Sequence, residues 1–411
     1  MKQWWTEWTG TVTDWVSSLP AAGYGIALWM LVAWVWAVTR HEKKRFGVTL
    51  KQPVILFFRL VFSGLLTGLI GSLLFAGLSF DIRGEDLWWI WGVSLVLSLA
   101  TPRLACLGTV AGVLSLASLT LSVTGIPETG GEWIRSLAGF RAEPWLWLAG
   151  LLHLAEWILI RLDGLRGAYP VQTRERDGQS VYGWMLTGMW PVPLLLFDGV
   201  NWLAVPVLLA YGSRTLSRPV LRQNRLVSTL HFLYALLLCG FAALGEWGSA
   251  WVWTAAFFAV AGHEGLHWLL RFTERNLPRL YVSDERGLRV LAVLPGSPAA
   301  RMGIKSGDVI VRFNGSNIRT VDELMHMSEH ATWCKLEVLD EQGDRHIMKK
   351  TLYEDDPRNL GVIGTSGLSG QAESKEGGKE AAAHPGAEAS GTAPTDGEVK
   401  TFRKGTGTED G

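Results

Sequence analysis

The sequence is poor in charged residues and in cysteine. Only 18% of its 411 residues are charged, against roughly 25% in a typical soluble protein. Together with a hydrophobic content of 48%, this excludes a disordered chain, a coiled coil and a nucleic-acid-binding protein with a basic field. The formal net charge of 0 is an average over regions that differ in charge. The 3 cysteines, Cys106, Cys239 and Cys334, are too few and too widely spaced for a disulfide framework or a paired metal-binding motif.

Apolar residues dominate instead, and 22 tryptophans stand among them. A bilayer core about 30 Å thick needs about 20 apolar residues in a helix, because backbone polar groups find no water there. Seven candidate runs are Gly23–Val38, Pro53–Phe80, Leu87–Ala100, Leu104–Thr124, Pro144–Ile160, Leu226–Leu244 and Ala250–Leu270. We therefore predict a polytopic α-helical membrane domain over residues 1–277, with about seven to nine helices. Residues 1–21 are rich in tryptophan and are expected to lie at the membrane interface.

Residues 181–213 are ambiguous, because they are longer than one span needs and Asp198-Gly199 interrupts them. The positive-inside rule places loops rich in Lys and Arg in the cytoplasm. Loop 40–52 and linker 213–225 are both of this kind. Counting crossings from loop 40–52 places residues 161–180 inside as well, so the linker is also inside only if 181–213 crosses twice, as a hairpin that turns at Asp198. We therefore predict nine crossings, an extracytoplasmic N-terminus and a cytoplasmic chain from residue 278 onward. A re-entrant loop over 181–213 is an alternative with the same sidedness.

From Pro278 the pattern changes to short apolar runs separated by turns. Strands are expected at Leu288–Leu294, Val309–Phe313, Lys335–Leu339 and His346–Leu352, and helices at Pro298–Met302 and Thr320–His330. Thr320 followed by Glu323 is a capping box. The motifs Pro295-Gly296-Ser297-Pro298, Gly303-Ile304, Gly307-Asp308 and Asn314-Gly315 resemble, in order and spacing, those of bacterial PDZ domains. This resemblance implies a small α+β PDZ domain over 278–364, a partly open β-barrel or sandwich with two helices.

A PDZ fold implies a peptide-binding groove, where an extended peptide adds to a sheet edge and its C-terminal carboxylate binds successive backbone N–H groups. The binding loop needs glycine between apolar residues, and Asn359-Leu360-Gly361-Val362-Ile363 fits. We expect the groove between this segment and the helix at 321–329, with Leu324 and Ser328 as its walls. The alternative is that Leu360–Ile363 is only the last core strand.

The chain therefore divides into three predicted parts. A transmembrane domain occupies 1–277, and a cytoplasmic PDZ domain occupies 278–364. Residues 365–411 are rich in Gly, Ala, Ser and Glu without apolar periodicity, so we expect a disordered tail there.

The pentad His263-Glu264-Gly265-Leu266-His267 is the sharpest chemical motif. HExxH on a helix can hold Zn²⁺ between two imidazoles, with the glutamate as general base for a bound water. With a PDZ domain, and with Asp198 as a third ligand, the chain is similar to site-2 intramembrane proteases. In that family HExxH lies in an early span and Asp-Gly follows the PDZ domain, whereas here Asp198-Gly199 comes before HExxH and before the PDZ domain. His153 and Glu156 are alternative ligands. The interpretation without metal is a polar patch near a cytoplasmic helix end, and on that interpretation no cofactor is expected.

A many-spanning domain followed by one C-terminal PDZ domain resembles the MinJ-type cell-division topology proteins of rod-shaped Gram-positive bacteria. The similarity is strongest over Pro295–Gly361 and covers the membrane half mainly in span layout. It implies a scaffold in the cell membrane, enriched at septum and poles, whose partners are DivIVA-like and MinD-like proteins. We therefore predict a membrane-anchored adaptor and not an enzyme. The alternative is a zinc metalloprotease with Glu264 as catalytic residue and His263 and His267 as ligands, and the oligomeric state stays open.

Overall fold

The computed structural model describes most of the chain before residue 366. The described residues are 19–78, 82–124, 126, 130–174, 180–197, 202–282, 285–329, 331–353, 356–357 and 359–365. The predicted interfacial segment therefore lies outside them up to residue 18, and the predicted tail lies outside them from residue 366.

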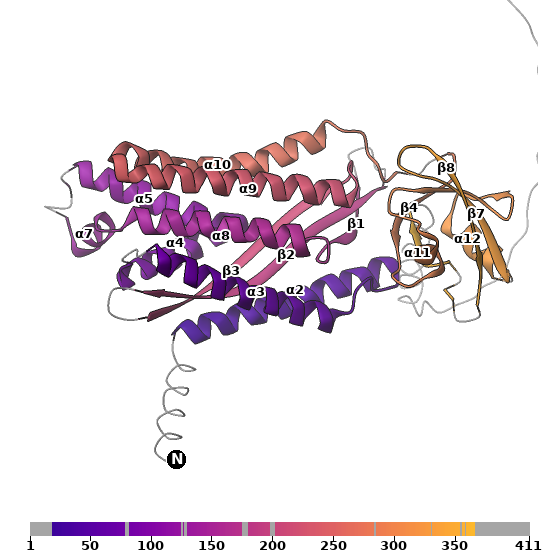
Figure 1. Cartoon of the computed structure of the whole chain (residues 1–411), viewed down its shortest axis with the longest axis horizontal. Coiled ribbons are helices and arrows are strands. Elements are labelled where there is room, and N and C mark those ends of the chain that lie inside the picture. Colours follow the sequence, from indigo (N-terminus) through magenta and orange to yellow (C-terminus); the bar gives the residue numbers. More distant parts are fainter. Residues whose placement is uncertain are drawn as a thin grey trace, which may run out of the picture. The chain divides into compact units, whose positions relative to one another are not determined.

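Eight α-helices are found among the described residues before the PDZ region (Figure 1). They are α2 (Leu19–Phe46), α3 (Pro53–Gly77), α4 (Gly84–Ala100), α5 (Leu107–Thr124), α7 (Glu132–Ala138), α8 (Ala142–Asp163), α9 (Val220–Leu244) and α10 (Ser249–Arg275). Each predicted apolar run largely coincides with one of them. Five, namely α2, α3, α5, α8 and α9, are long and apolar enough to cross a membrane. The predicted polytopic α-helical membrane domain is confirmed.

Helix α3 shows how such a helix divides between lipid and protein. Phe58 and Phe62 are 65% and 67% exposed on one face. Leu60, Gly64 and Gly68 are buried on the other. An apolar face turned outward is stable only against hydrocarbon, so this helix has the composition of a membrane span.

The ambiguous stretch forms a long β-hairpin and not the helical legs that the prediction of seven to nine helices included. Strand β1 (Tyr169–Arg174) pairs with β2 (Ser180–Phe197), and β2 pairs with β3 (Trp202–Thr215), all antiparallel. Helix α3 packs along β2 and α2 along β3, and Figure 1 shows the hairpin passing between these helices and the pair α8 and α9. The predicted turn at Asp198 lies outside the described residues. This segment forms strands and not a helix because two prolines two residues apart would remove backbone donors from a helix and clash with its preceding turn.

The unpaired edge of β2 is closed by α3. A Cβ on Gly64 would lie 2.2 Å from the carbonyl oxygen of Pro191, and one on Gly68 would lie 2.2 Å from that of Pro193. Only glycine lets a helix approach a strand so closely. Since Pro191 and Pro193 have no N–H, this edge presents no unsatisfied donor at either residue.

The next donor along the same edge has a side-chain acceptor. The N–H of Leu195 donates to Ser72 Oγ at 2.9 Å, and that hydroxyl donates in turn to the Gly68 carbonyl at 2.6 Å. An extended chain rises about 3.3 Å per residue, so the 14 residues of β3 reach about 46 Å, further than a bilayer core. The hairpin is therefore long enough to cross twice, and the nine-crossing topology stays a prediction.

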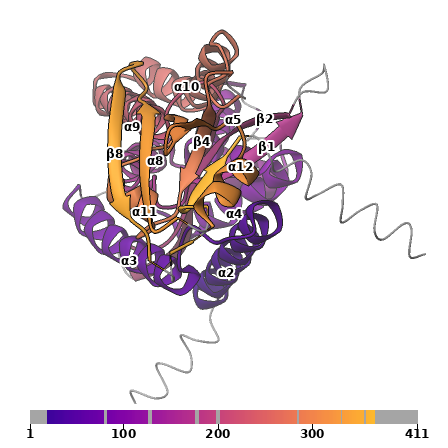
Figure 2. The same ribbon diagram turned by 90° about the vertical axis from the view of Figure 1, so that its right-hand side faces the viewer.

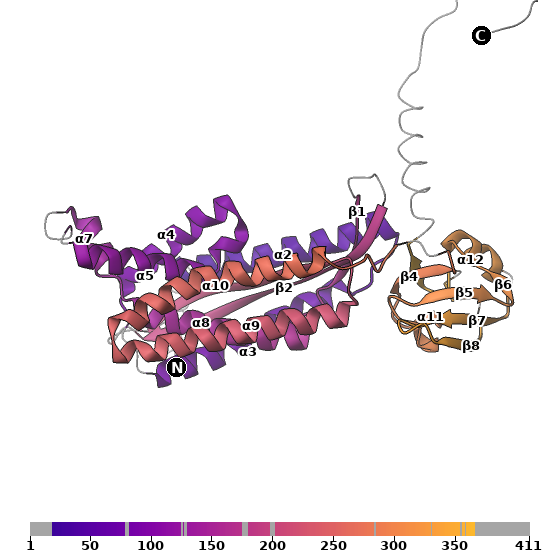
Figure 3. The same cartoon turned by 90° about the horizontal axis from the view of Figure 1, so that it is seen from above.

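The C-terminal region is a sheet with two helices (Figures 2 and 3). Its elements are β4 (Leu288–Val293), α11 (Pro298–Met302), β5 (Val309–Phe313), β6 (Ser316–Asn317), α12 (Val321–Ser328), β7 (Trp333–Leu339), β8 (Arg345–Thr351) and β9 (Val362–Gly364). The strand order is β8-β7-β5-β4-β9, and β6 pairs with β5. Thr320 and Glu323 form the predicted capping box at the start of α12. Alternate residues of β4 and β7, together with Ile310 and Phe313 of β5, contribute to a separate apolar core.

The strand hairpin also contacts the C-terminal sheet. Trp184 of β2 donates from Nε1 to the Leu291 carbonyl at 3.1 Å and to Ser306 Oγ at 3.2 Å. The backbone N–H of Tyr182 donates to the Tyr281 carbonyl at 3.3 Å. Tyr281 is fully buried there, and burial raises the pKa of its hydroxyl to about 12. These contacts connect the end of β2 in the membrane domain to the segment where the C-terminal domain begins.

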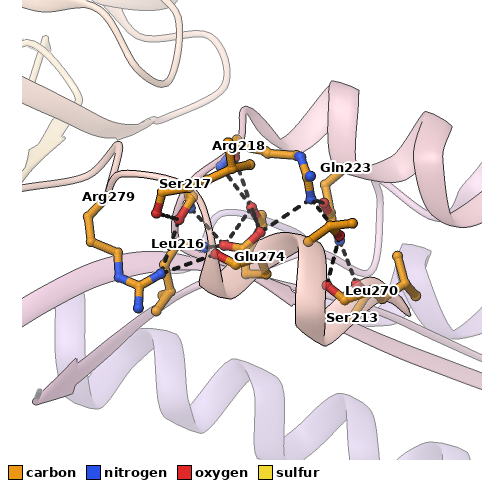
Figure 4. Close-up of polar contacts among 11 residues, drawn as sticks. Ser213, Leu216, Ser217, Arg218, Gln223, Leu270, Glu274 and Arg279 are labelled. Carbon is orange, nitrogen blue, oxygen red and sulfur yellow. Dashed lines mark hydrogen bonds and ion pairs between the residues drawn. The ribbon is translucent and has the colours of Figure 1, made fainter. Parts of the chain in front are cut away.

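Glu274 near the end of α10 fixes the linker between the two regions (Figure 4). Its carboxylate accepts the backbone N–H groups of Leu216 and of Ser217, the latter at 2.8 Å. Arg279 reaches Ser217 Oγ at 3.1 Å from the other side. The chain that leaves α10 is thereby held against the turn that follows β3.

Candidate functional site

The predicted groove lies at the last strand of the C-terminal sheet. Strand β9 pairs antiparallel with β4 and, among the described residues, with no other strand. Helix α12 packs beside it: a Cβ on Gly364 would lie 2.7 Å from Val321 Cγ2. An edge strand flanked by a helix is the arrangement that accepts a peptide as an added strand.

The predicted groove residues occupy two different packing environments. Leu360, Val362 and Leu324 are buried in the core of the C-terminal domain. Ile363 belongs instead to a second apolar cluster. That cluster contains Leu291 and also residues of the membrane domain, such as Phe46 and Tyr182. The strand therefore binds its own domain through one face and the membrane domain through the other.

Helix α12 turns one defined face toward β9. Val321 and Ser328 are buried, and the Ser328 hydroxyl donates to the Met325 carbonyl at 3.1 Å. Met325 is 37% exposed. Since Val321, Met325 and Ser328 are spaced at i, i+4 and i+7, they share one side of the helix, and Met325 is its accessible member.

The predicted carboxylate-binding loop has its donors engaged internally. The N–H of Leu360 donates to the Pro357 carbonyl at 2.7 Å, and that of Val362 donates to the Asn359 carbonyl at 2.9 Å. The N–H of Gly361 donates to Asn359 Oδ1 at 3.0 Å. A ligand carboxylate must therefore replace these acceptors. Asn359, which the predicted loop segment included without a role, accepts two of these donors through its backbone carbonyl and its side chain.

Gly361 is required by the shape of this loop. Its φ is +79°, and that of Leu360 is +56°. A Cβ on Gly361 would lie 2.2 Å from Ser297 Cβ. The apolar-glycine-apolar pattern thus reflects both backbone conformation and contact with the turn before α11.

The HEGLH pentad lies on α10, and its members point to different partners. His263 is buried, and its ring centroid lies 4.8 Å from that of His267. Glu264 forms an ion pair with Arg103 at 3.0 Å. Asp198, the predicted third ligand, lies outside the described residues.

The alternative ligands His153 and Glu156 come from α8 and lie close to the pentad. The ring centroids of His153 and His263 are 5.7 Å apart. A third residue that sequence spacing did not indicate lies beside these two histidines, namely Cys106, directly before α5. The structure thus groups the first histidine of the pentad with α5 and α8 residues.

Comparison with known proteins agrees with this architecture. Residues 289–326 match the PDZ domain family. The chain is 24% identical over 182 residues to the cell division topological determinant MinJ of Bacillus subtilis, which covers 42% of this chain and 44% of that protein. It is 26% identical over 80 residues to the probable cell division topological determinant MinJ of Lacticaseibacillus paracasei, covering 19% and 22%. It is 51% identical over 39 residues to the protein named putative protease Do-like 14 of Arabidopsis thaliana, covering 10% and 9%.

The aligned regions span less than half the length of these relatives. The match to a PDZ family confirms the predicted PDZ domain, and the helices confirm the membrane domain that precedes it. In both its sequence and its arrangement, an apolar multi-helix domain followed by a PDZ domain, the chain resembles the MinJ-type cell-division topological determinants of Gram-positive bacteria.

Proposed function

We propose that this chain is a membrane-anchored scaffold whose PDZ domain, residues 278–364, binds protein partners on the cytoplasmic side. The observation that carries the proposal is the edge strand β9, which has α12 beside it and, among the described residues, pairs only with β4. Leu360, Gly361, Val362 and Ile363 supply the strand to which a partner adds. Leu324 and Ser328 belong to the helix wall, with Met325 as its exposed member.

The partners that we propose are components of the division-site machinery. Similarity to proteins named as cell division topological determinants supports this assignment. The scaffold would sit at poles and septa, bind a DivIVA-like protein and position a MinD-like division inhibitor. Its task would be tethering, since Glu264, the candidate general base, is paired with Arg103.

The test is a full-length fluorescent fusion that replaces the chromosomal copy in the native host. The fusion should concentrate at septa and poles, and cells should keep their normal length. Met325→Lys places a charge on the accessible wall of the groove and should disperse the signal along the membrane and lengthen the cells.

His326→Lys is the matched control, because His326 is the next exposed residue on α12 and points away from the shared face. It should localise like the unmodified fusion. Uniform membrane signal together with normal cell length in the unmodified strain would contradict the scaffold function. Equal effects of both substitutions would contradict the placement of the groove.

A further inference from the structure

Three potential metal ligands converge inside the membrane domain from three separate segments. Cys106 precedes α5, His153 lies on α8 and His263 lies on α10. Their ligand atoms all lie within 4.8 Å of one another, and Cys106 Sγ is 3.1 Å from His153 Nε2. We propose that these residues bind one transition-metal ion of the Zn²⁺ class.

The donor set and spacing select the class of ion. Zn²⁺ binds thiolate sulfur at about 2.3 Å and imidazole nitrogen at about 2.0–2.1 Å, so tetrahedral ligands stand roughly 3.3–3.6 Å apart. The Cys106 to His153 separation is already close to that value. One sulfur and two nitrogens suit Zn²⁺ and related borderline ions, whereas Mg²⁺ and Ca²⁺ require oxygen donors.

Neighbouring polar groups orient the two imidazoles. Glu156 Oε2 lies 2.9 Å from His153 Nδ1, which favours the proton on Nδ1 and leaves Nε2 free to face Cys106. Thr109 Oγ1 lies 3.3 Å from His263 Nδ1. A carboxylate behind a metal-binding histidine is the usual second layer of such sites.

The surroundings are built closely around the cluster. A Cβ on Gly108 would lie 2.9 Å from His153 Nε2 and 2.7 Å from the Tyr234 hydroxyl. The Tyr234 ring meets the His153 ring edge-on at 4.8 Å, and its hydroxyl donates to the Ala259 carbonyl at 2.8 Å. Glycine at the first turn of α5 thus brings the cysteine segment against the imidazole.

Burial explains why an ion would belong there. His153, Glu156 and His263 are each 5% exposed or less. Such polar groups inside an apolar bundle are costly unless they are paired or bind a metal. The bound ion would join the start of α5 to α8 and α10, and the Cys106 thiol proton would be released to solvent on binding. The role is structural and independent of the proposed scaffold function.

The test uses the full-length protein, purified in detergent through a tag that contains no histidine. Zinc content by mass spectrometry should be about one ion per chain, and Co²⁺ substitution should give a sulfur-to-cobalt charge-transfer band. Cys106→Ser should remove that band, and Cys106→Ser, His153→Gln and His263→Gln should each lose the ion. Glu156→Gln should retain the site but weaken its affinity about 10-fold to 100-fold.

Cys239→Ser is the matched control, since Cys239 is a membrane-domain thiol outside the Cys106 cluster, and it should keep the ion. Should a ligand variant fail to fold, chelation of the unmodified protein is the second measurement and should lower its melting temperature. Less than about a tenth of an ion per chain after Zn²⁺ loading would overturn the proposal. Retention of the ion by Cys106→Ser with loss in His267→Gln would overturn it as well, and would assign the metal to the HEGLH pair. A metal-free protein whose Cys106 is rapidly alkylated would instead identify a thiolate–imidazolium pair.

Discussion

The two sheets of this protein differ in whether the edge of the outer strand is covered by a helix. In the membrane domain, α3 covers the outer edge of β2, where Pro191 and Pro193 provide no donors and Ser72 accepts the N–H of Leu195. In the PDZ domain, β9 pairs only with β4 among the described residues. The edge of β2 is covered by α3 and lacks free donors at its prolines, whereas β9 has an edge to which no further strand is paired among the described residues.

On the predicted topology the hairpin crosses the bilayer and the PDZ domain lies in water, and this would account for the difference. Inside a bilayer an unpaired backbone group has no water to bind, so an edge must be covered or stripped of donors. In water an edge strand can stay unpaired and add a strand from a partner. The same chain thus shows which features make a strand edge structural and which make it a binding surface.

The largest effect should come from breaking the closed edge at Gly68. Gly68→Ala would place its Cβ 2.2 Å from the Pro193 carbonyl oxygen, and α3 would have to move away from β2. We expect the free energy of unfolding to fall by about 3 kcal/mol, measured by thermal unfolding in detergent. Gly77→Ala, on the same helix with nothing within 4 Å, should have little effect. Equal stability of both variants would contradict the close packing of α3 on β2.

The second largest effect should come from a substitution at Gly361, in the loop before the edge strand β9. Gly361→Ala combines a φ of +79° with a clash against Ser297, so the binding loop should lose its conformation. We expect the PDZ domain to be destabilised by about 2 kcal/mol, measured by its susceptibility to limited proteolysis in the full-length protein. Gly343→Ala has a similar φ of +89° but no neighbour within 4 Å, and it should cost only about 1 kcal/mol. A larger loss in Gly343→Ala would refute the contact with Ser297.

Ser72→Ala sharpens the comparison by leaving one donor on the closed edge without its acceptor. The Leu195 N–H would lose its 2.9 Å hydrogen bond in an apolar setting. An orphaned buried donor costs about 1–3 kcal/mol, and we expect the lower part of this range in thermal unfolding. Ser98→Ala removes an exposed hydroxyl that donates to the Leu95 carbonyl, and it should change the melting temperature little. Indistinguishable melting of the two variants would show that Ser72 does not serve the edge.

The smallest effect concerns Lys51, which donates to the Ala168 carbonyl just before β1. Burial lowers the pKa of Lys51 to about 8 from 10.5. Above about pH 8 the unfolded chain binds more protons at this site than the folded chain, so stability should rise with pH until about pH 10. The full shift would correspond to about 3 kcal/mol, but Lys51 is partly exposed and solvent screens its charge. We therefore expect a gain of about 1 kcal/mol across that window, and Lys51→Met should remove it. A melting temperature equally dependent on pH in both proteins would exclude this assignment.

The sequence predicted the helices and the PDZ domain because their signals are local. Apolar runs of span length marked the helices, and the capping box at Thr320 marked the start of α12. The β-hairpin was harder to predict, because its two apolar strands have the same composition as membrane-spanning helices. Its signal was present, however: Pro191 and Pro193 are spaced to face one edge of a strand, and neither fits a helix interior.

The Cys106 cluster could not be predicted in the same way. Its members are 47 and 110 residues apart in sequence, and no motif joins them. They meet because α5, α8 and α10 pack together. The sequence indicated His263 through its spacing with His267 and offered His153 as an alternative ligand, whereas the tertiary fold adds Cys106 and brings all three together.

The covering of the hairpin also fixes an order for biogenesis. The two helices with the most extensive packing on the strands, α2 beside β3 and α3 beside β2, precede the hairpin along the chain. During synthesis from the N-terminus they emerge before residue 180 is made. The strands can therefore pack against α2 and α3 as soon as they are made, and α9, which follows them in the chain, packs on their other side later.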